Sequence, residues 1–511
     1  MTPSNAPSNT GSGNGPSTSP CRPTVLDALN QALDRGGSET EDNPWHGLWY
    51  EFLRDRALPA IIADGAITPA ASLWTGARLW TEAFRSAGLK AGDRLVVALD
   101  PSPVFVQVLV AGLWESLSVA LLPPDGQPEE ALSALDARAA VSGNDHRHGW
   151  TPDGCSGPCT TPESLRPTAA PRTPDVRFLL QTSGTTGLAR WIALSDRNVL
   201  SVLASHLPHL RLSEARVLSV LPWSHAFGLV LDLLPALLAG AEIIRDPEGG
   251  RSPDRLLSLR DTWGATHLNA VPLTIDRLRE HPRGPRLLSA LKGGIVGGAA
   301  VSGPLAEALS QTHLRVGYGQ TEAAPGITLG ARGEWAANYL GVPVGCEVDV
   351  TASGELRFRG PNACLGVWSD GRLDRADPDR WVYTGDLVEQ NGDALYFRGR
   401  TDDAFKLPNG RLVQAGEWEA RLKEQFDRLH DALVYTCKNV DVGVALCLAP
   451  DAAAEPPSVG AVRDCLRPLD SWVSDVRTLD LQDWQSLPKG EVDRQAMTEA
   501  LATRHVVSSS P

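Results

Sequence analysis

Apolar residues between about residue 23 and residue 172 alternate between helical and strand-like patterns. Leu26–Leu33 has helical spacing, Arg94–Leu99 is a short apolar run typical of a buried strand, and Val104–Glu115 is an apolar run of helical length. Because alternating strands and helices are typical of layered α/β proteins, this pattern predicts an α/β layer. Residues 144–174 are rich in Gly, Pro, Asp and Thr, which predicts a loop.

A second alternating region follows. It contains predicted strands at Val176–Leu180 and Val217–Leu221 and predicted helices at Arg197–Leu207 and Leu229–Leu238. Strands joined by helices pair in parallel through right-handed crossovers. Further on, Gly354–Arg359 and Ala394–Arg398 read as short alternating strands, which predict a smaller β-rich subdomain. The last hundred or so residues, after Gly399, are predicted to form a separate α+β unit.

Length and charge narrow the class of protein. A chain of 511 residues exceeds what one hydrophobic core usually holds, so two or more domains are expected. The formal net charge of -14 argues against a broad nucleic-acid surface, which would need clustered Lys and Arg. The eight cysteines lack the spacing of a structural zinc site and are expected to be reduced.

The composition of the N-terminal residues and the length of the apolar runs suggest where in the cell the protein acts. Residues 1–24 are mostly Ser, Thr, Pro, Asn and Gly, which predicts a disordered tail rather than a signal peptide. The sequence lacks a run of about 20 uninterrupted apolar residues, so a membrane span is not expected. A cytoplasmic enzyme is the expectation.

A loop of small and hydroxyl residues follows the predicted strand that ends near Leu180. It consists of Thr182, Ser183, Gly184, Thr185, Thr186 and Gly187, and Arg190 follows it. Glycines allow close approach of backbone N–H groups, hydroxyls donate hydrogen bonds and the arginine supplies charge, so such a loop can surround phosphate oxygens. A surface turn of the same composition is the alternative.

The loop and other segments, in this order, resemble the signatures of the adenylate-forming superfamily, which includes acyl-CoA synthetases, nonribosomal-peptide adenylation domains and firefly luciferase. The further matching segments are Leu221–Leu229, Gly297–Ala300, Gly317–Glu322, Gly354–Gly360, Tyr383–Asp386 and Gly399–Asp402. The resemblance implies an AMP-binding domain over residues 25–400, with α/β layers and a small β-rich subdomain. It also implies a mobile α+β lid domain over residues 401–511, with a hinge at Asp402.

The resemblance also assigns candidate ligands of ATP and Mg²⁺. The nucleotide-binding candidates beyond the loop are Tyr318, Gly319, Thr321, Asp386 and Arg400. An aromatic ring can stack on a base, an aspartate can bind ribose hydroxyls, and the carboxylate of Glu322 can hold Mg²⁺ beside the phosphates. A capping turn, a turn aspartate and a surface arginine are the ordinary alternatives for these residues.

The same resemblance places an acyl pocket beside these residues. Its candidate walls are His225, Phe227, Gly298, Ala299 and Ala300. A histidine among apolar residues is more often packed than catalytic, so His225 is expected to shape the pocket.

The chain departs from the family pattern near its C-terminus. Leu487–Arg494 aligns with Leu-Pro-x-Gly-Lys-x-x-Arg, and Glu491 occupies the position of the catalytic lysine. An anion there would repel the phosphates. Lys489 lies two residues earlier and is the candidate replacement, so the catalytic candidates are Arg190, Glu322 and Lys489. A second departure is Arg190–Trp191, where the family usually has Lys-Gly.

The leading hypothesis is an AMP-forming acid–thiol ligase of secondary metabolism. It activates a carboxylic acid as acyl-AMP, releases pyrophosphate and transfers the acyl group to coenzyme A, a carrier-protein thiol or an amine. One alternative is a degenerate homologue that binds nucleotide or acyl ligand without completing adenylation. Another is a different ATP-driven condensation, such as activation of nitrite for N–N bond formation.

Overall fold

A computed structural model describes the greater part of the chain. The described residues are 24–35, 43–53, 60–143, 175–182, 190–409, 411–426, 428–437, 441–448, 456–467, 469–486 and 492–507. The predicted tail and the predicted loop at residues 144–174 lie outside these ranges, apart from Thr24. Among the described helices, none is long and apolar enough to cross a membrane.

A seven-stranded sheet forms the first layer, in the order β18-β17-β7-β6-β4-β3-β5. Its strands are β3 (Arg94–Ala98), β4 (Ser118–Leu121), β5 (Ala139–Ser142), β6 (Phe178–Thr182), β7 (Arg190–Leu194), β17 (Gly366–Ser369) and β18 (Arg372–Arg375). Alternate residues of the central strands enter two different hydrophobic cores, one on each face. Burial on both faces explains why these strands are continuous apolar runs.

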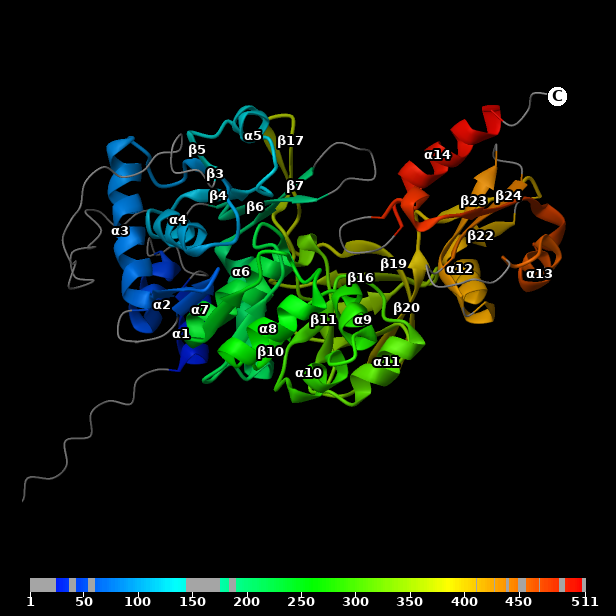
Figure 1. Cartoon of the computed structure of the whole chain (residues 1–511). Coiled ribbons are helices and arrows are strands. Elements are labelled where there is room, and N and C mark those ends of the chain that lie inside the picture. The colour runs from blue at the N-terminus through cyan, green and yellow to red at the C-terminus, as the bar shows by residue number, and fades with distance from the viewer. Residues whose placement is uncertain are drawn as a thin grey trace, which may run out of the picture.

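Helices cover both faces of this sheet. The helices of the larger core are α1 (Val25–Arg35), α2 (Pro44–Leu53), α3 (Ala70–Ser86), α4 (Pro103–Trp114), α6 (Asp196–Leu210) and α7 (Leu234–Ala239). On the other face, α5 (Pro128–Leu135) contributes Ala131 and Leu135 to the smaller core. Figure 1 shows α3 and α4 in blue beside the strands.

A five-stranded sheet forms the second layer, in the order β10-β8-β9-β1-β2. Its strands are β1 (Ala60–Ala63), β2 (Ala66–Pro69), β8 (Arg216–Ser219), β9 (Glu242–Arg245) and β10 (His267–Asn269). One face joins the larger core, and the other packs on α8 (Pro253–Trp263), α9 (Pro272–Glu280), α10 (Gly284–Ala290) and α11 (Gly303–Ser310). The larger core therefore lies between the two sheets.

An eight-stranded sheet extends from these layers in the order β11-β12-β13-β14-β20-β19-β16-β15. Its strands are β11 (Ile295–Gly297), β12 (Arg315–Tyr318), β13 (Thr328–Leu329), β14 (Tyr339–Pro343), β15 (Glu347–Val350), β16 (Glu355–Arg359), β19 (Val382–Asn391) and β20 (Ala394–Arg400). The β11–β12 pair is parallel and the remaining pairs are antiparallel.

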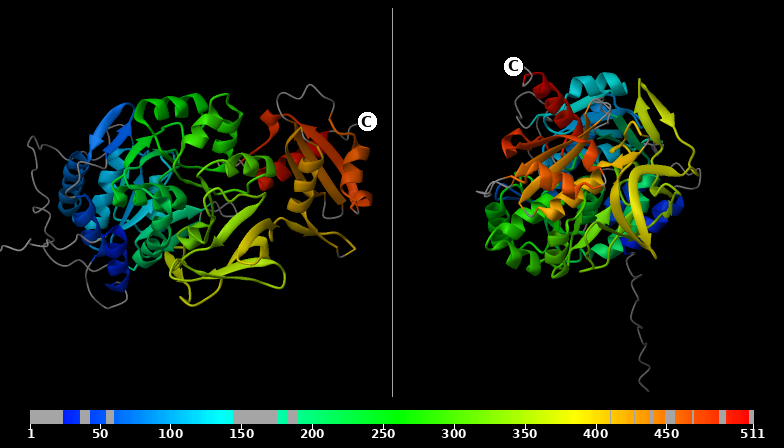
Figure 2. Two further views of the ribbon diagram at one scale, coloured as in Figure 1. Left: turned by 90° about the horizontal axis from the view of Figure 1, so that it is seen from below. Right: turned by 90° about the vertical axis from the view of Figure 1, so that its right-hand side faces the viewer.

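The C-terminal part has its own sheets and cores. It comprises β21 (Ala404–Lys406), β22 (Leu412–Gln414), α12 (Ala415–Gln425), β23 (Leu429–Cys437), β24 (Asp441–Leu448), α13 (Val459–Cys465), η4 (Asp470–Trp472), β25 (Val473–Leu479), η5 (Leu481–Asp483) and α14 (Arg494–Val507). Two hydrophobic clusters of its own hold these elements together. Figure 2 shows this unit, in orange and red, at one end of the molecule.

The structure confirms the predicted α/β class and differs in three respects. The strands predicted near Val176–Leu180 and Val217–Leu221 are β6 and β8, which belong to different sheets and do not pair with each other. The sequence reading missed β7, which runs antiparallel to β6 instead of leading into a helix crossover. The predicted helix at Leu229–Leu238 is a π-helix, η2 (Phe227–Leu233), followed by the short α7. A π-helix has the same apolar composition as an α-helix, so hydrophobic spacing did not distinguish the two.

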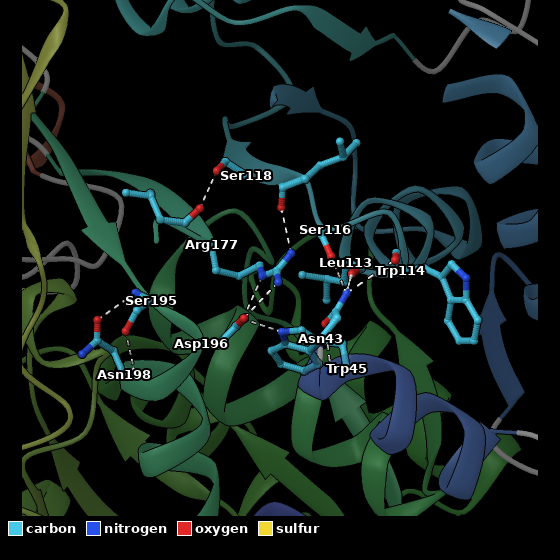
Figure 3. Close-up of polar contacts among 12 residues, drawn as sticks. Asn43, Trp45, Leu113, Trp114, Ser116, Ser118, Arg177, Ser195, Asp196 and Asn198 are labelled. Carbon is cyan, nitrogen blue, oxygen red and sulfur yellow. Dashed lines mark hydrogen bonds and ion pairs between the residues drawn. The ribbon is translucent and has the colours of Figure 1, made fainter. Parts of the chain in front are cut away.

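A buried ion pair connects the N-terminal helices to the first sheet (Figure 3). Arg177 donates from Nε and Nη2 to the two carboxylate oxygens of Asp196, at 2.7 Å and 2.9 Å. The indole of Trp45, on α2, donates to the same carboxylate at 2.6 Å, and Arg177 also donates to the Leu117 carbonyl. Each charge is therefore paired and hydrogen-bonded inside the core, as burial requires.

We expect Asp196→Ala to lower the free energy of unfolding of the N-terminal layers by about 3–5 kcal/mol, because the substitution leaves the Arg177 charge buried without its partner. Urea unfolding followed by circular dichroism measures this change. Asp175→Ala is the control, since it breaks the exposed Asp175–Arg375 pair and should cost less than about 1 kcal/mol. Equal losses in the two variants would contradict the assigned role of the buried pair.

Candidate functional site

The predicted phosphate loop joins two adjacent antiparallel strands. β6 ends at Thr182, β7 begins at Arg190, and these two residues lie directly opposite each other. The predicted loop residues Ser183, Gly184, Thr185, Thr186 and Gly187 lie outside the described residues. Arg190 is exposed, so its cation is at the base of the loop and open to a ligand.

The indole that follows this arginine has a structural role. Trp191 is buried and belongs to the core that contains Leu179 and Ala193. It lies opposite Trp368 in the β7–β17 pair. The sequence departure at Arg190–Trp191 therefore adds a large side chain to the core of the sheet.

A tight turn follows β12 and carries the next group of candidates. Tyr318 ends β12, and Thr321 and Glu322 lie on the short 3-10 helix η3 (Thr321–Ala323), all three half-buried. A Cβ atom at Gly319 would lie 1.6 Å from the carbonyl oxygen of Pro325, so the turn accepts only glycine there. The Glu322 carbonyl accepts a hydrogen bond of 2.8 Å from Cys364 N–H. This bond holds η3 beside the residues that immediately precede β17.

Asp386 connects this turn to β20. Its buried carboxylate accepts a 2.6 Å hydrogen bond from the Tyr318 hydroxyl and a 2.7 Å ion-pair contact from Arg400 Nη1. Asp386 and Arg400 lie opposite each other in the β19–β20 pair. The structure thus brings together three of the predicted nucleotide-binding side chains, from three strands.

The protonation of this cluster follows from its surroundings. Burial, together with the charge and hydrogen bond of Asp386, raises the pKa of Tyr318 well above its usual value. Burial opposes the charge of Arg400, but the hydrogen bond with Asp402 and the charges of Asp386, Asp402 and Asp403 outweigh it and raise the pKa of Arg400. Tyr318 is therefore a hydroxyl donor and Arg400 a cation at neutral pH.

The same arginine contacts the predicted hinge. Arg400 Nε donates to Asp402 at 2.9 Å, and Asp402 is exposed. The neighbouring Asp403 pairs at 3.0 Å with Arg494, the first residue of α14. Arg494 also pairs with the buried Glu419 on α12. These ion pairs join the end of the eight-stranded sheet to α12 and α14 of the C-terminal part.

The predicted pocket walls come from two other elements. His225 lies in the turn before η2, and Phe227 begins η2, where it packs partly against both large cores. Gly298, Ala299 and Ala300 follow β11; Gly298 and Ala300 are exposed, and Ala299 is half-buried. Although the His225 residue is exposed by surface area, desolvation by the protein around its ring lowers its pKa, so its imidazole is neutral at pH 7.

A buried polar cluster near these walls was missed by sequence reasoning. Asp232, on η2, is buried with Ser219, Asn269 and Arg245, which end three neighbouring strands. The available signal was a single aspartate within the apolar run of residues 229–238. Buried charges are rare unless they are paired, so that aspartate should have drawn attention.

Glu322 is the carboxylate that the sequence analysis assigns to Mg²⁺. Among the described residues, three or more His, Cys, Asp or Glu side chains do not gather into a ready-made metal site. Mg²⁺ usually binds through one or two carboxylates together with substrate phosphates, and the half-buried Glu322 suits that mode. The catalytic candidate Lys489 and the anion Glu491 lie outside the described ranges.

Comparison with known proteins identifies relatives of the chain. A feruloyl-CoA synthase from an Amycolatopsis species is 28% identical over 343 residues, which cover 61% of this chain and 69% of that protein. A medium-chain fatty-acid–CoA ligase from Escherichia coli is 28% identical over 301 residues, which cover 53% of this chain but only 51% of that protein.

Solved structures share the fold. ATP-bound MatB from Rhodopseudomonas palustris superimposes with a TM-score of 0.75 at 20% identity, over 91% of this chain and 99% of that one. The model of a family described as AMP-binding enzyme matches residues 58–368, which is more than half of the chain. As the ordered motifs predicted, the chain belongs to the family of AMP-binding enzymes, within the adenylate-forming superfamily.

Proposed function

We propose that the chain is an AMP-forming acid–thiol ligase that uses ATP to activate a carboxylic acid. A carboxylate oxygen of the acid attacks the α-phosphorus of ATP, and the bond to pyrophosphate breaks. The thiol of coenzyme A then attacks the acyl carbonyl, its proton is lost, and AMP leaves. The observation that carries the proposal is the Tyr318–Asp386–Arg400 cluster, whose side chains come together from three strands.

The cluster suits the ribose end of a nucleotide. Asp386 would share its carboxylate between ribose hydroxyls and the donors that already contact it, with Arg400 beside it. The turn at Gly319 directly follows Tyr318, and Thr321 on η3 would offer its hydroxyl to the phosphates. The loop of residues 182–187 would surround the remaining phosphate oxygens.

Electrostatic stabilisation would supply most of the rate acceleration. The reaction moves negative charge onto the departing pyrophosphate, and preorganised cations stabilise such charge strongly. Arg190, at the base of the loop, is one such cation, and Lys489 is the second by its position in the sequence. Mg²⁺ held by Glu322 would act as a Lewis acid that neutralises phosphate charge.

The acid is proposed to be an apolar acyl or aryl acid. By their names, the two relatives act on feruloyl and medium-chain fatty acyl groups. The proposed walls, Phe227 and the small residues 298–300, are apolar, and their size would leave room for such groups. A neutral His225 would shape this pocket without carrying charge into it. We place the reaction in secondary metabolism, and in the cytoplasm, where ATP and coenzyme A are available.

The C-terminal part is proposed to act as a separate mobile domain. Its sheets and clusters are its own, and we propose a boundary between residues 400 and 401 with Asp402 as the hinge. The hinge would alternate between two orientations, one for adenylation and one for thioester formation. The ion pairs of Arg400 with Asp402 and of Arg494 with Asp403 would have to rearrange in this motion.

We expect the purified chain, with ATP and Mg²⁺, to release pyrophosphate with at least one acid of a panel of aryl, medium-chain fatty and amino acids. Addition of coenzyme A should then yield the matching thioester, which mass spectrometry detects. Tight ATP binding without pyrophosphate release for any acid of the panel would overturn the ligase proposal. Acyl transfer to a carrier-protein thiol or an amine, but not to coenzyme A, would change the acceptor alone.

We expect Asp386→Asn to raise the KM for ATP by about 10-fold or more, since a hydrogen bond to a charged group contributes about 1.5–3 kcal/mol. The KM for the acid should change much less. Initial rates of pyrophosphate release at varied ATP measure both constants.

Glu389→Gln is the matched control for this variant. Glu389 lies on the same strand and pairs across it with Arg398 on β20, but the pair is exposed. The KM of Glu389→Gln for ATP should stay within about twofold of the wild-type value, because exposed ion pairs contribute little free energy. The same KM in both variants would contradict a ribose-binding role for Asp386.

A second candidate function is a homologue that binds nucleotide without adenylating an acid, and Glu491 is the observation that favours it. Our ligase proposal expects Lys489→Ala to abolish most pyrophosphate release while ATP binding remains. Full activity in Lys489→Ala would show that Lys489 does not replace the missing lysine. Activity that appears only in Glu491→Lys would favour the non-adenylating homologue.

A further inference from the structure

A continuous chain of buried hydrogen bonds connects the segments that carry the proposed acyl pocket. The Trp223 indole donates to Ser219 Oγ at 3.0 Å, and Ser219 Oγ donates to Asp232 Oδ2 at 2.5 Å. On its other side, Asp232 Oδ1 accepts from Asn269 Nδ2 at 2.9 Å, and Asn269 Oδ1 accepts from the Ile295 N–H at 2.8 Å. We call these five residues the Asp232 network.

The strand register places the network at the carboxyl end of the second sheet. Ser219 ends β8 and lies opposite Arg245 at the end of β9 and Asn269 at the end of β10. These three strands are parallel, and ligands of α/β sheets bind at the carboxyl ends of parallel strands. The network therefore lies at the edge of the sheet where a substrate is expected.

Each end of the network is close in sequence to a proposed wall of the pocket. Trp223 precedes His225 by two residues, and Asp232 lies on the same π-helix as Phe227. Ile295 begins β11, which leads directly to Gly298. The β10–β11 connection is close, since Gly297 N–H donates to the Ala270 carbonyl at 3.1 Å. One carboxylate thus connects both walls.

The carboxylate of Asp232 is held on both sides by donors within the core. Burial raises its pKa, and the hydrogen bonds of Ser219 and Asn269 and the charge of Arg245 oppose that shift. Arg245 donates to the carbonyls of Ser219 and Leu221 at 3.0 Å and 2.8 Å. These contacts keep the strand end rigid around the carboxylate.

The π-helical form of η2 adds a second reason to consider this wall specialised. π-helical turns are rare and are frequently found at functional sites. Asn269 Nδ2 also donates to the carbonyl of Leu231, in η2, at 3.2 Å. The network therefore holds the backbone of this π-helix as well as its aspartate.

We propose that Asp232 is a positioning residue that sets which acids the pocket accepts, because its carboxylate fixes the separation of the η2 wall from the wall that follows β11. The inference rests on the proposed ligase function and on the pocket assigned there. Asp232 itself does not contact the acid. It acts through Phe227 on one side and through Gly298, Ala299 and Ala300 on the other.

Asp232→Asn tests the role without a change of volume. If the new amide oxygen faces Ser219, its NH₂ group faces the NH₂ group of Asn269, and two donors meet. If the amide turns over, its NH₂ group faces Ser219 Oγ, which already accepts from Trp223 and would lose the acceptor for its own proton. Either orientation breaks the chain at one point.

The double variant Asp232→Asn/Asn269→Asp restores that chain with the two groups exchanged. Asn at position 232 can accept from Ser219 and donate to Asp at position 269, and that carboxylate can accept from the Ile295 N–H. The contact with the Leu231 carbonyl is the loss that remains. A selectivity effect of hydrogen bonding should therefore be reversed in the double variant, whereas a general loss of packing should not.

The experiment measures kcat/KM for pyrophosphate release with two accepted acids that differ in size. The ratio of the two values does not depend on how much of the preparation is folded, so it separates selectivity from stability. We expect Asp232→Asn to change the ratio by about 10-fold, which is the discrimination that small changes in an apolar pocket produce. The KM for ATP should remain that of the wild type, and the double variant should return the ratio toward the wild-type value.

Asp196→Asn is the control, since it makes the same substitution at another buried carboxylate, which accepts three hydrogen bonds from Arg177 and Trp45. It should lower the melting temperature and leave the acid ratio unchanged. An unchanged ratio in an active Asp232→Asn enzyme, or an equal change in Asp196→Asn, overturns the inference alone. A wild-type chain that activates no acid overturns the proposed ligase function, and the inference with it.

Discussion

The buried carboxylate of Asp386 needs partners for its negative charge, and these partners fix the geometry of the candidate site. The Tyr318 hydroxyl comes from the strand before the glycine turn, and Arg400 comes from the last strand before the C-terminal part. Because Arg400 also pairs with Asp402, the charge at the proposed ribose site and the charge at the proposed hinge belong to one cluster. A change at either end alters the electrostatics of the other.

Much of the fold followed from hydrophobic spacing. The buried runs that became β3 and β6 were visible because strands covered on both faces are continuously apolar. β7 was missed because a strand that returns directly from a loop has no helix before it to mark its start. Whether the segment at η2 forms an α-helix or a π-helix depends on which backbone groups hydrogen-bond, and the apolar pattern carries no information about that spacing.

The candidate site, like the fold, was predictable from the sequence only in part. Motif order identified Tyr318, Asp386 and Arg400, and the structure brings these three side chains together. The contacts of Arg494 with Asp403 and Glu419 could not be predicted, because residues far apart in sequence form them. The expected roles of Lys489 and of the loop after Thr182 remain predictions, since these residues lie outside the described ranges.

The π-helix at Phe227–Leu233 has a consequence for how such a pocket can change during evolution. A π-helical turn holds about one residue more than an α-helical turn, so one deletion within it would give an ordinary α-helix. Successive residues of an α-helix are about 100° apart around the axis, so that deletion would rotate Phe227 relative to the anchored Asp232. A single codon lost or gained in this segment would therefore reshape one wall of the pocket while the strands beneath it kept their register.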